Sequence, residues 1–166
     1  MNKPKVAKAA KWNGGTIEII VDRKWFTSGS TVKGKIALKQ DKDFDGTELM
    51  VGLLGTEVNY FRRVNADEDT VYHDKHVLIN AGVSVHKFEN AKSLLGEQEY
   101  DFEFTLPEWL PQSFIYCGDH CSSNFKIKYL IWAQILPVNK SDYIDSKKSL
   151  SVFRGALDIY ITRPQR

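Results

Sequence analysis

The residues of this chain that could ligate a metal are histidines and cysteines at short spacings. Two residues separate His73 from His76, three separate Cys117 from Cys121, and His120 precedes the second cysteine. Zinc prefers such donors, but its structural sites usually show closer pairs. On a strand, residues three apart point to opposite faces, so His73 and His76 would not converge. We therefore expect no metal site and no cofactor.

Carboxylates that could form an acid and base pair alternate along one segment, at Glu99, Asp101 and Glu103. Alternation places them on one face of a strand, where contact with water is the simpler explanation. We expect Lys126 and Lys128 to pair with them from a neighbouring strand. The sequence has no glycine-rich phosphate loop, no Gly-x-Ser-x-Gly elbow and no His-Glu-x-x-His motif. It therefore predicts a protein that is not an enzyme.

The charge balance restricts the partners. Among 166 residues, 23 are Lys or Arg and 21 are Asp or Glu, so the net charge is +2. A near balance argues against a general polyanion binder, and we expect no nucleic-acid partner. The sequence shows neither a secretory signal nor an apolar run of membrane-spanning length. We therefore predict a cytoplasmic protein, in which both cysteines are free thiols.

Alternation of apolar and polar residues predicts strands along most of the chain. The strand at residues 48–60 should be central, because residues 49–55 are apolar on both faces. Residues 61–69 break the pattern and should form a protruding loop. A helical turn is possible only near residues 90–95. The predicted strands span residues 16–22, 31–39, 48–60, 72–80, 83–88, 100–106 and 125–135. A polar loop at residues 139–149 then precedes a last strand or pair of strands at residues 150–161.

The stretch from residue 97 to residue 135 sets the architecture. Its first strand ends at Pro107 and Pro111, which cannot donate to a strand ladder and carry the chain to the other sheet. Two long amphipathic strands need a second apolar sheet to cover them. The fold class is therefore all-β, an immunoglobulin-like β-sandwich of two antiparallel sheets. We expect this domain to span residues 16–166, after a flexible basic arm or edge strand at residues 1–15.

Three motifs follow one another in the chain: residues 25–36, Leu53-Leu54-Gly55, and residues 96–114, which read G-x-x-x-Y-x-F-x-F-x-L-P-x-x-L-P-x-S-F. With Ile17-Glu18-Ile19 and residues 127–134, they cover nearly the whole chain. They resemble the N-terminal lobe of an arrestin, and most closely the alpha-arrestins, or arrestin domain-containing proteins. Arrestins have a second such lobe, which the resemblance places beyond this chain. The Pro-Pro-x-Tyr motif that recruits ubiquitin ligases to alpha-arrestins is absent from these residues.

The resemblance implies a partner-binding loop, because residues 61–69 stand where arrestins carry the finger loop. We expect Tyr60, Phe61, Arg62 and Arg63 to contact the partner, since aromatic and arginine side chains are favoured at interfaces. The alternative is a solvated hairpin loop without a partner.

The resemblance also implies positions for phosphate recognition, namely Lys8, Lys11, Arg23 and Lys24. Lysines at a sheet edge could hold a phosphorylated peptide through charge-assisted hydrogen bonds. However, Trp25 and Ser28 stand where the acids of the arrestin polar core are expected, and Arg154 is the only candidate for its arginine. We therefore do not expect activation by phosphate, and the alternative for the four basic residues is a solubilising surface.

Three functions remain open. The first is a non-catalytic adaptor that links membrane-protein cargo or receptors to trafficking or ubiquitination machinery, with peripheral association at the plasma membrane or endosomes. The second is a coat subunit of arrestin fold, like that of retromer, which binds one scaffold protein constitutively. The third is a β-sandwich that binds a small ligand such as a carbohydrate through exposed Trp12, Trp25, Trp109 or Trp132.

Overall fold

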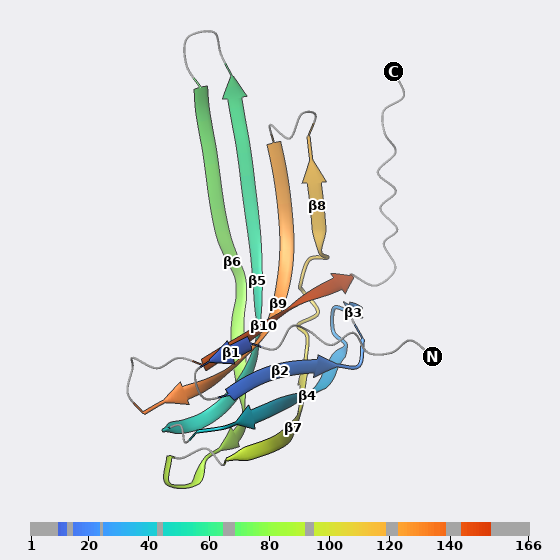
Figure 1. Ribbon diagram of the computed structural model, residues 1–166. Helices are drawn as coiled ribbons and strands as arrows, with labels where there is room; N and C mark the ends of the chain where they lie inside the picture. Colours follow the sequence, from blue (N-terminus) through green and yellow to red (C-terminus); the bar gives the residue numbers. More distant parts are fainter. Residues whose placement is uncertain are drawn as a thin grey trace.

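The computed structural model describes residues 10–12, 15–23, 25–42, 45–64, 69–91, 95–118, 123–138 and 144–153. Its strands form two sheets that pack face to face (Figure 1), and this confirms the predicted all-β sandwich. The four-stranded sheet has the order β1-β2-β4-β7, with β1 (Ala10–Trp12), β2 (Gly15–Val21), β4 (Thr31–Gln40) and β7 (Gly96–Thr105).

The six-stranded sheet has the order β3-β10-β9-β5-β6, and β8 pairs with β9. All of its pairs are antiparallel except that of β10 with β3, which is parallel. On β9, β10 pairs with residues 129–135 and β8 with residues 124–127, so the two follow one another along the same side of β9. The strands are β3 (Trp25–Thr27), β5 (Gly46–Val64), β6 (Asp69–Lys87), β8 (Phe114–Cys117), β9 (Ser123–Pro137) and β10 (Ile144–Phe153).

The core lies between the two sheets and consists of the inward side chains that the alternation predicts. From the four-stranded sheet come Ile17, Ile19, Val32, Ile36 and Phe102, all buried. From the six-stranded sheet come Leu49, Val51, Leu53, Tyr129, Ile131, Ala133 and Ile135, also buried.

Tyr129 ties the core to the crossing between the two prolines. Its hydroxyl donates a hydrogen bond of 2.6 Å to the carbonyl oxygen of Pro111. The side chain is buried, and burial raises the pKa of Tyr129 to about 12, because the phenolate would lose its hydration.

A second polar feature stabilises the opposite, water-facing side of the four-stranded sheet. Its lysines on β4 and carboxylates on β7 form cross-strand ion pairs, each with a distance of 2.9 Å, namely Lys33–Glu103, Lys35–Glu99 and Lys39–Glu97. The prediction that Lys126 and Lys128 pair with these carboxylates is therefore wrong, because both lysines lie on β9 in the other sheet.

The two strands predicted at residues 72–80 and 83–88 are one strand, β6, preceded by a shorter connection than expected. Ala81 and Gly82 continue the pairing with β5, opposite Leu53 and Gly52. The register shifts twice along this pair, once between Leu49 and Met50 and again between Gly55 and Thr56. Neither shift lies at residues 80–83, where the pairing is regular. The small residues there interrupt the apolar pattern without ending the ladder, which needs only backbone partners.

The remaining differences concern strand ends. The short strands β3 and β8 were not predicted, and β10 begins at Ile144, inside the predicted loop at residues 139–149. The short 3-10 helix at Glu89–Ala91 lies at the start of the predicted helical turn. Residues 154–161 of the last predicted strand lie outside the described residues.

Candidate functional site

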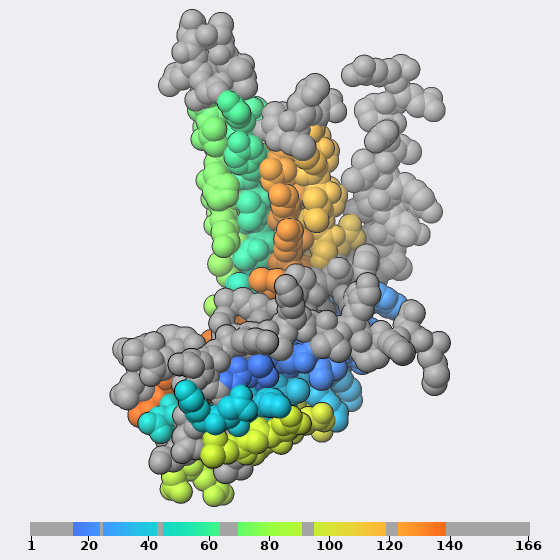
Figure 2. Space-filling view, viewed as in Figure 1, coloured from blue at the N-terminus to red at the C-terminus, as the bar shows by residue number. Residues whose placement is uncertain are grey.

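The six-stranded sheet is longer than the sheet that covers it. Beyond the sandwich, parts of β5, β6, β8 and β9 continue as a narrow extension (Figure 1), and the space-filling view shows them standing clear of β2, β4 and β7 (Figure 2). We call this extension the projecting sheet, formed by residues 56–64, 69–78, 114–117 and 123–128. Its strand order is β8-β9-β5-β6.

The projecting sheet has two faces, which strand register defines. The inner face continues the side of β5 and β9 that carries the core, and the outer face is the opposite side. Asn59 pairs with Phe125 and with Asp74, and Phe61 pairs with Ser123 and with Tyr72, so these side chains share the inner face. Val58 and its partners Lys75 and Lys126 share the outer face.

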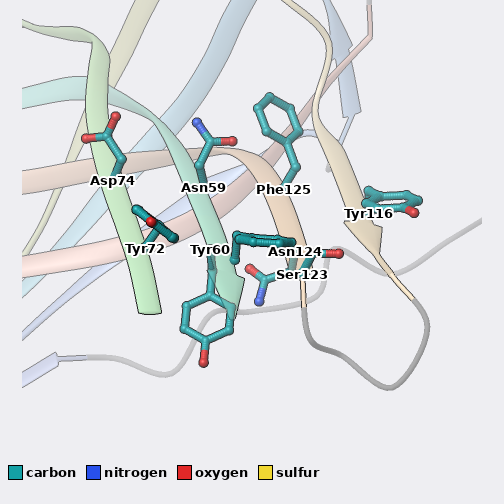
Figure 3. A pocket seen from close by; sticks show the side chains of 9 residues that line it. Asn59, Tyr60, Tyr72, Asp74, Tyr116, Ser123, Asn124 and Phe125 are labelled. Carbon is teal, nitrogen blue, oxygen red and sulfur yellow. The ribbon is translucent and has the colours of Figure 1, made fainter. Parts of the chain in front are cut away.

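Aromatic side chains of the inner face surround a shallow hollow of about 250 Å³ (Figure 3). Phe61 and Tyr72 pack with their ring centroids 6.2 Å apart, and Phe125 packs on Phe114 at 5.7 Å. Tyr116 of β8 borders the far side. The hollow is therefore a row of rings across all four strands, positioned by backbone pairing rather than by a loop.

Polar groups stand at the β5 and β6 side of the hollow. The Nδ2 of Asn59 donates a 3.1 Å hydrogen bond to Glu57 Oε1, and Asp74 Oδ2 lies 2.7 Å from His76 Nε2. These contacts hold the amide and the carboxylate beside the rings. Such an arrangement can receive an apolar or aromatic side chain and offer a hydrogen bond at its edge.

The four residues predicted to contact a partner lie within β5, which continues to Val64, so they are part of a strand and not of a loop. Pairing with β6 extends strand structure past the last buried residue, because a ladder needs backbone partners but no alternating pattern. Alternation places Phe61 and Arg63 on the inner face and Tyr60 and Arg62 on the outer face. In Figure 3 the Tyr60 ring points away from the Asn59 side chain. Phe61 and Tyr60 both line the hollow, although their side chains leave β5 on opposite faces, whereas Arg62 and Arg63 are not among its lining residues.

The predicted phosphate-binding residues are only partly described. Arg23 Nε lies 3.4 Å from Asp22 Oδ2, and its guanidinium carbon lies 5.2 Å from the Phe26 ring centroid. Lys8, Lys24 and Arg154 lie outside the described residues, and of Lys11 only the backbone, in β1, is described. A phosphate site at these residues stays a prediction.

Metal donors do not gather in the part of the chain that is described. His73 pairs with Tyr60 and His76 with Glu57, which places the two histidines on opposite faces. Cys121 and His120 lie outside the described residues. Among the described residues, no three His, Cys, Asp or Glu side chains are grouped as a metal site, and no helix is long and apolar enough to cross a membrane.

Sequence reasoning missed most of the hollow. Tyr72, Tyr116 and Phe125 stood in or beside predicted strands, but nothing local indicated that their faces would be left without a covering sheet. The available signal was that aromatic side chains continue on both sides of the break at residues 61–69, which is more than a solvated hairpin needs.

Comparisons with known proteins agree with this fold. Residues 16–154 match the family model of the arrestin (or S-antigen) N-terminal domain. A similar solved structure is the crystal structure of Spo0M, a sporulation control protein from Bacillus subtilis, with a TM-score of 0.55 and 16% sequence identity. The match covers 85% of this chain and 50% of that chain, so this chain spans about half the length of the solved protein. No curated protein matches the sequence. The family match covers most of the chain, which therefore belongs to the arrestin family as an arrestin N-terminal domain.

Proposed function

We propose that this arrestin domain is a non-catalytic, protein-binding adaptor of the alpha-arrestin type. It links membrane-protein cargo or receptors to trafficking or ubiquitination machinery, and it works in the cytoplasm at the plasma membrane or at endosomes. The partner binds on the inner face of the projecting sheet. The fold supports this proposal only in general terms, and the aromatic hollow is the specific observation that carries it.

The hollow has the composition of a protein interface. Phe61, Tyr72 and Tyr116 are 48%, 60% and 51% exposed, although large aromatic side chains usually lie in a core. Aromatic residues are enriched at interfaces and supply much of their binding energy. Because the rings are carried by paired strands, little conformational entropy is lost when a partner orders them. An interface here would be preorganised.

The size of the hollow favours a protein side chain over a small ligand. Its volume of about 250 Å³ lies below the range of about 300–1,000 Å³ that is typical of small-molecule pockets. Trp25 and Trp109 are exposed and keep the carbohydrate alternative open, whereas Trp132 packs against Gly52 and Gly82. The adaptor is therefore the preferred function.

Affinity capture from extracts of cells that naturally contain this protein tests the proposal. The variant combines Phe61→Ser with Tyr72→Ser, and the control combines Lys33→Gln with Glu103→Gln, which removes an exposed ion pair from the four-stranded sheet. We expect the wild type and the control to retain partners that the variant loses, with receptors or ubiquitin ligases among them.

Other outcomes point elsewhere. One stoichiometric partner would indicate a coat subunit, and glycan binding without protein partners would indicate a carbohydrate binder. Equal recovery of every partner by the wild type and by the Phe61 and Tyr72 variant would contradict a binding site on the inner face.

A further inference from the structure

The outer face of the projecting sheet carries three lysines that have no counter-charge among the residues that the structure describes. Lys75, Lys126 and Lys128 form no ion pair with any described residue, whereas Lys33, Lys35 and Lys39 of β4 each pair with a carboxylate of β7. The charges of the three β4 lysines are thus neutralised within the fold, whereas those of the three lysines of the projecting sheet are available to a ligand.

The register places these lysines close together. Val58 pairs with Lys75 on one side and Lys126 on the other, and Lys126 pairs in turn with Ile115. One row of side chains therefore crosses all four strands. With strands about 4.8 Å apart, the two lysine Cα atoms of this row are about 10 Å apart. Lys128 follows two residues along β9, about 7 Å from Lys126.

The same face has exposed aliphatic side chains and no carboxylate whose side chain the structure describes. Val71, Val77 and Ile115 pair with Arg62, Thr56 and Lys126, which places them on the outer face. They are 54%, 60% and 65% exposed. Glu57 and Asp74 are the carboxylates whose side chains are described in the projecting sheet, and both belong to the inner face. Among the described side chains the outer face is therefore cationic and aliphatic, whereas the inner face carries aromatic rings, two carboxylates and Arg63.

We propose that the outer face of the projecting sheet binds an anionic lipid bilayer. Aliphatic side chains between lysines suit the boundary between headgroups and acyl chains, where lysine stems lie along apolar groups and their ammonium groups reach the phosphates. Negatively charged lipids attract each basic residue near the membrane surface. Three lysines without a lipid anchor give reversible binding.

An acidic peptide fits these observations less well. Peptides usually bind in a groove or add to a free sheet edge, and the hollow of the projecting sheet lies on the inner face. Lipid on the outer face would leave that hollow turned away from the bilayer, toward the cytoplasm. The inference deepens the proposed function and rests on it in one respect, since it names the surface by which an adaptor reaches a membrane.

Co-sedimentation with lipid vesicles tests the proposal. The wild type should bind phosphatidylcholine vesicles that contain phosphatidylserine, should not bind pure phosphatidylcholine, and should bind less as salt is added. The triple variant Lys75→Gln, Lys126→Gln and Lys128→Gln should reduce partitioning on the order of a hundredfold, because each lysine contributes about fivefold.

A matched control separates this surface from net charge. The triple variant Lys33→Gln, Lys35→Gln and Lys39→Gln loses the same three charges and should keep its vesicle binding. Equal loss in both variants, or no binding of the wild type to anionic vesicles, would overturn the proposal. Binding to polyglutamate without binding to vesicles would also overturn it and would assign the face to an acidic protein.

The two proposals fail separately. The outer-face variant should still capture the protein partners that depend on Phe61 and Tyr72. If vesicle binding is absent and partner capture persists, the membrane surface is wrong and the adaptor function stands. If vesicle binding depends on the three lysines and no partner is captured, the adaptor function is wrong and the membrane-binding surface stands.

Discussion

At the scale of single residues, Tyr129 is the contact whose removal is most easily measured. Tyr129→Phe leaves the ring in the core but removes the donor to the Pro111 carbonyl. We expect the free energy of unfolding to fall by about 1 kcal/mol, the usual contribution of one hydrogen bond. Urea denaturation gives this value, and Tyr72→Phe, at an exposed ring, is the control. No change in the Tyr129 variant would show that the hydroxyl does not stabilise the crossing.

The same residue predicts how stability depends on pH. The pKa of Tyr129 is about 12 in the folded chain, whereas an unperturbed tyrosine, as in the unfolded chain, has a pKa of 10.0. Between pH 10 and pH 12 the unfolded chain has lost the Tyr129 proton that the folded chain keeps. The contribution of this hydroxyl to the free energy of unfolding is therefore complete below pH 10 and is lost as the pH rises through 12. The stability difference between the wild type and Tyr129→Phe should therefore narrow over this window. Parallel curves would contradict the burial of the hydroxyl.

Gly52 shows a requirement that no local pattern reveals. A Cβ atom there would lie 2.2 Å from Trp132 Cζ2 and 2.4 Å from the Ala81 carbonyl oxygen. Gly52→Ala must push apart two neighbouring strands, and we expect a loss of about 1–3 kcal/mol, read from thermal unfolding. Asn80→Ala, at an exposed position of β6, is the control. An unchanged melting temperature would mean that the Trp132 ring moves freely. The contact depends on the register of β5 and β9, which the sequence alone does not specify.

At the scale of elements, the lysines of β4 and the carboxylates of β7 define how these strands pair. Lys35→Glu should destabilise the sheet, because it places like charges opposite each other, and adding Glu99→Lys should restore part of the loss. The pair is exposed, so the coupling should weaken as salt is added. A double-mutant cycle at two salt concentrations measures it. A coupling that is zero at low salt would exclude this ion pair as a determinant of pairing.

Elements were predictable from the sequence where one face is buried. Residues 16–22 and 31–39 alternate because their inward side chains meet the core, and these strands lie within one residue of their observed ends. Over most of the projecting sheet, beyond core residues such as Ile127, neither face packs against the other sheet, so alternation no longer indicates which segments form strands. For this reason the sequence pattern predicts a loop at the end of β5 and predicts no strand at β8.

At the scale of the whole molecule, the sandwich followed from the need to cover two amphipathic layers. The projecting sheet could not be predicted in this way. Hydrophobic patterning specifies which face of a strand is buried, but not how far the strand continues beyond the sheet that covers it. The candidate site arises from this difference in length between the two sheets. Phe61 was anticipated as a contact residue through the resemblance to arrestins, whereas Tyr72, Tyr116 and Phe125 join it only through the pairing of four strands.

Site-specific photocrosslinking tests the central claim most directly. A benzoylphenylalanine in place of Tyr72 puts a reactive group at the hollow, and the same group in place of Lys33 puts it on the water-facing side of the four-stranded sheet. After irradiation in extracts of the producing cells, the protein carrying the group at position 72 should form adducts with partner proteins, and the protein carrying it at position 33 should not. Adducts from position 33 together with none from position 72 would contradict a partner site on the projecting sheet.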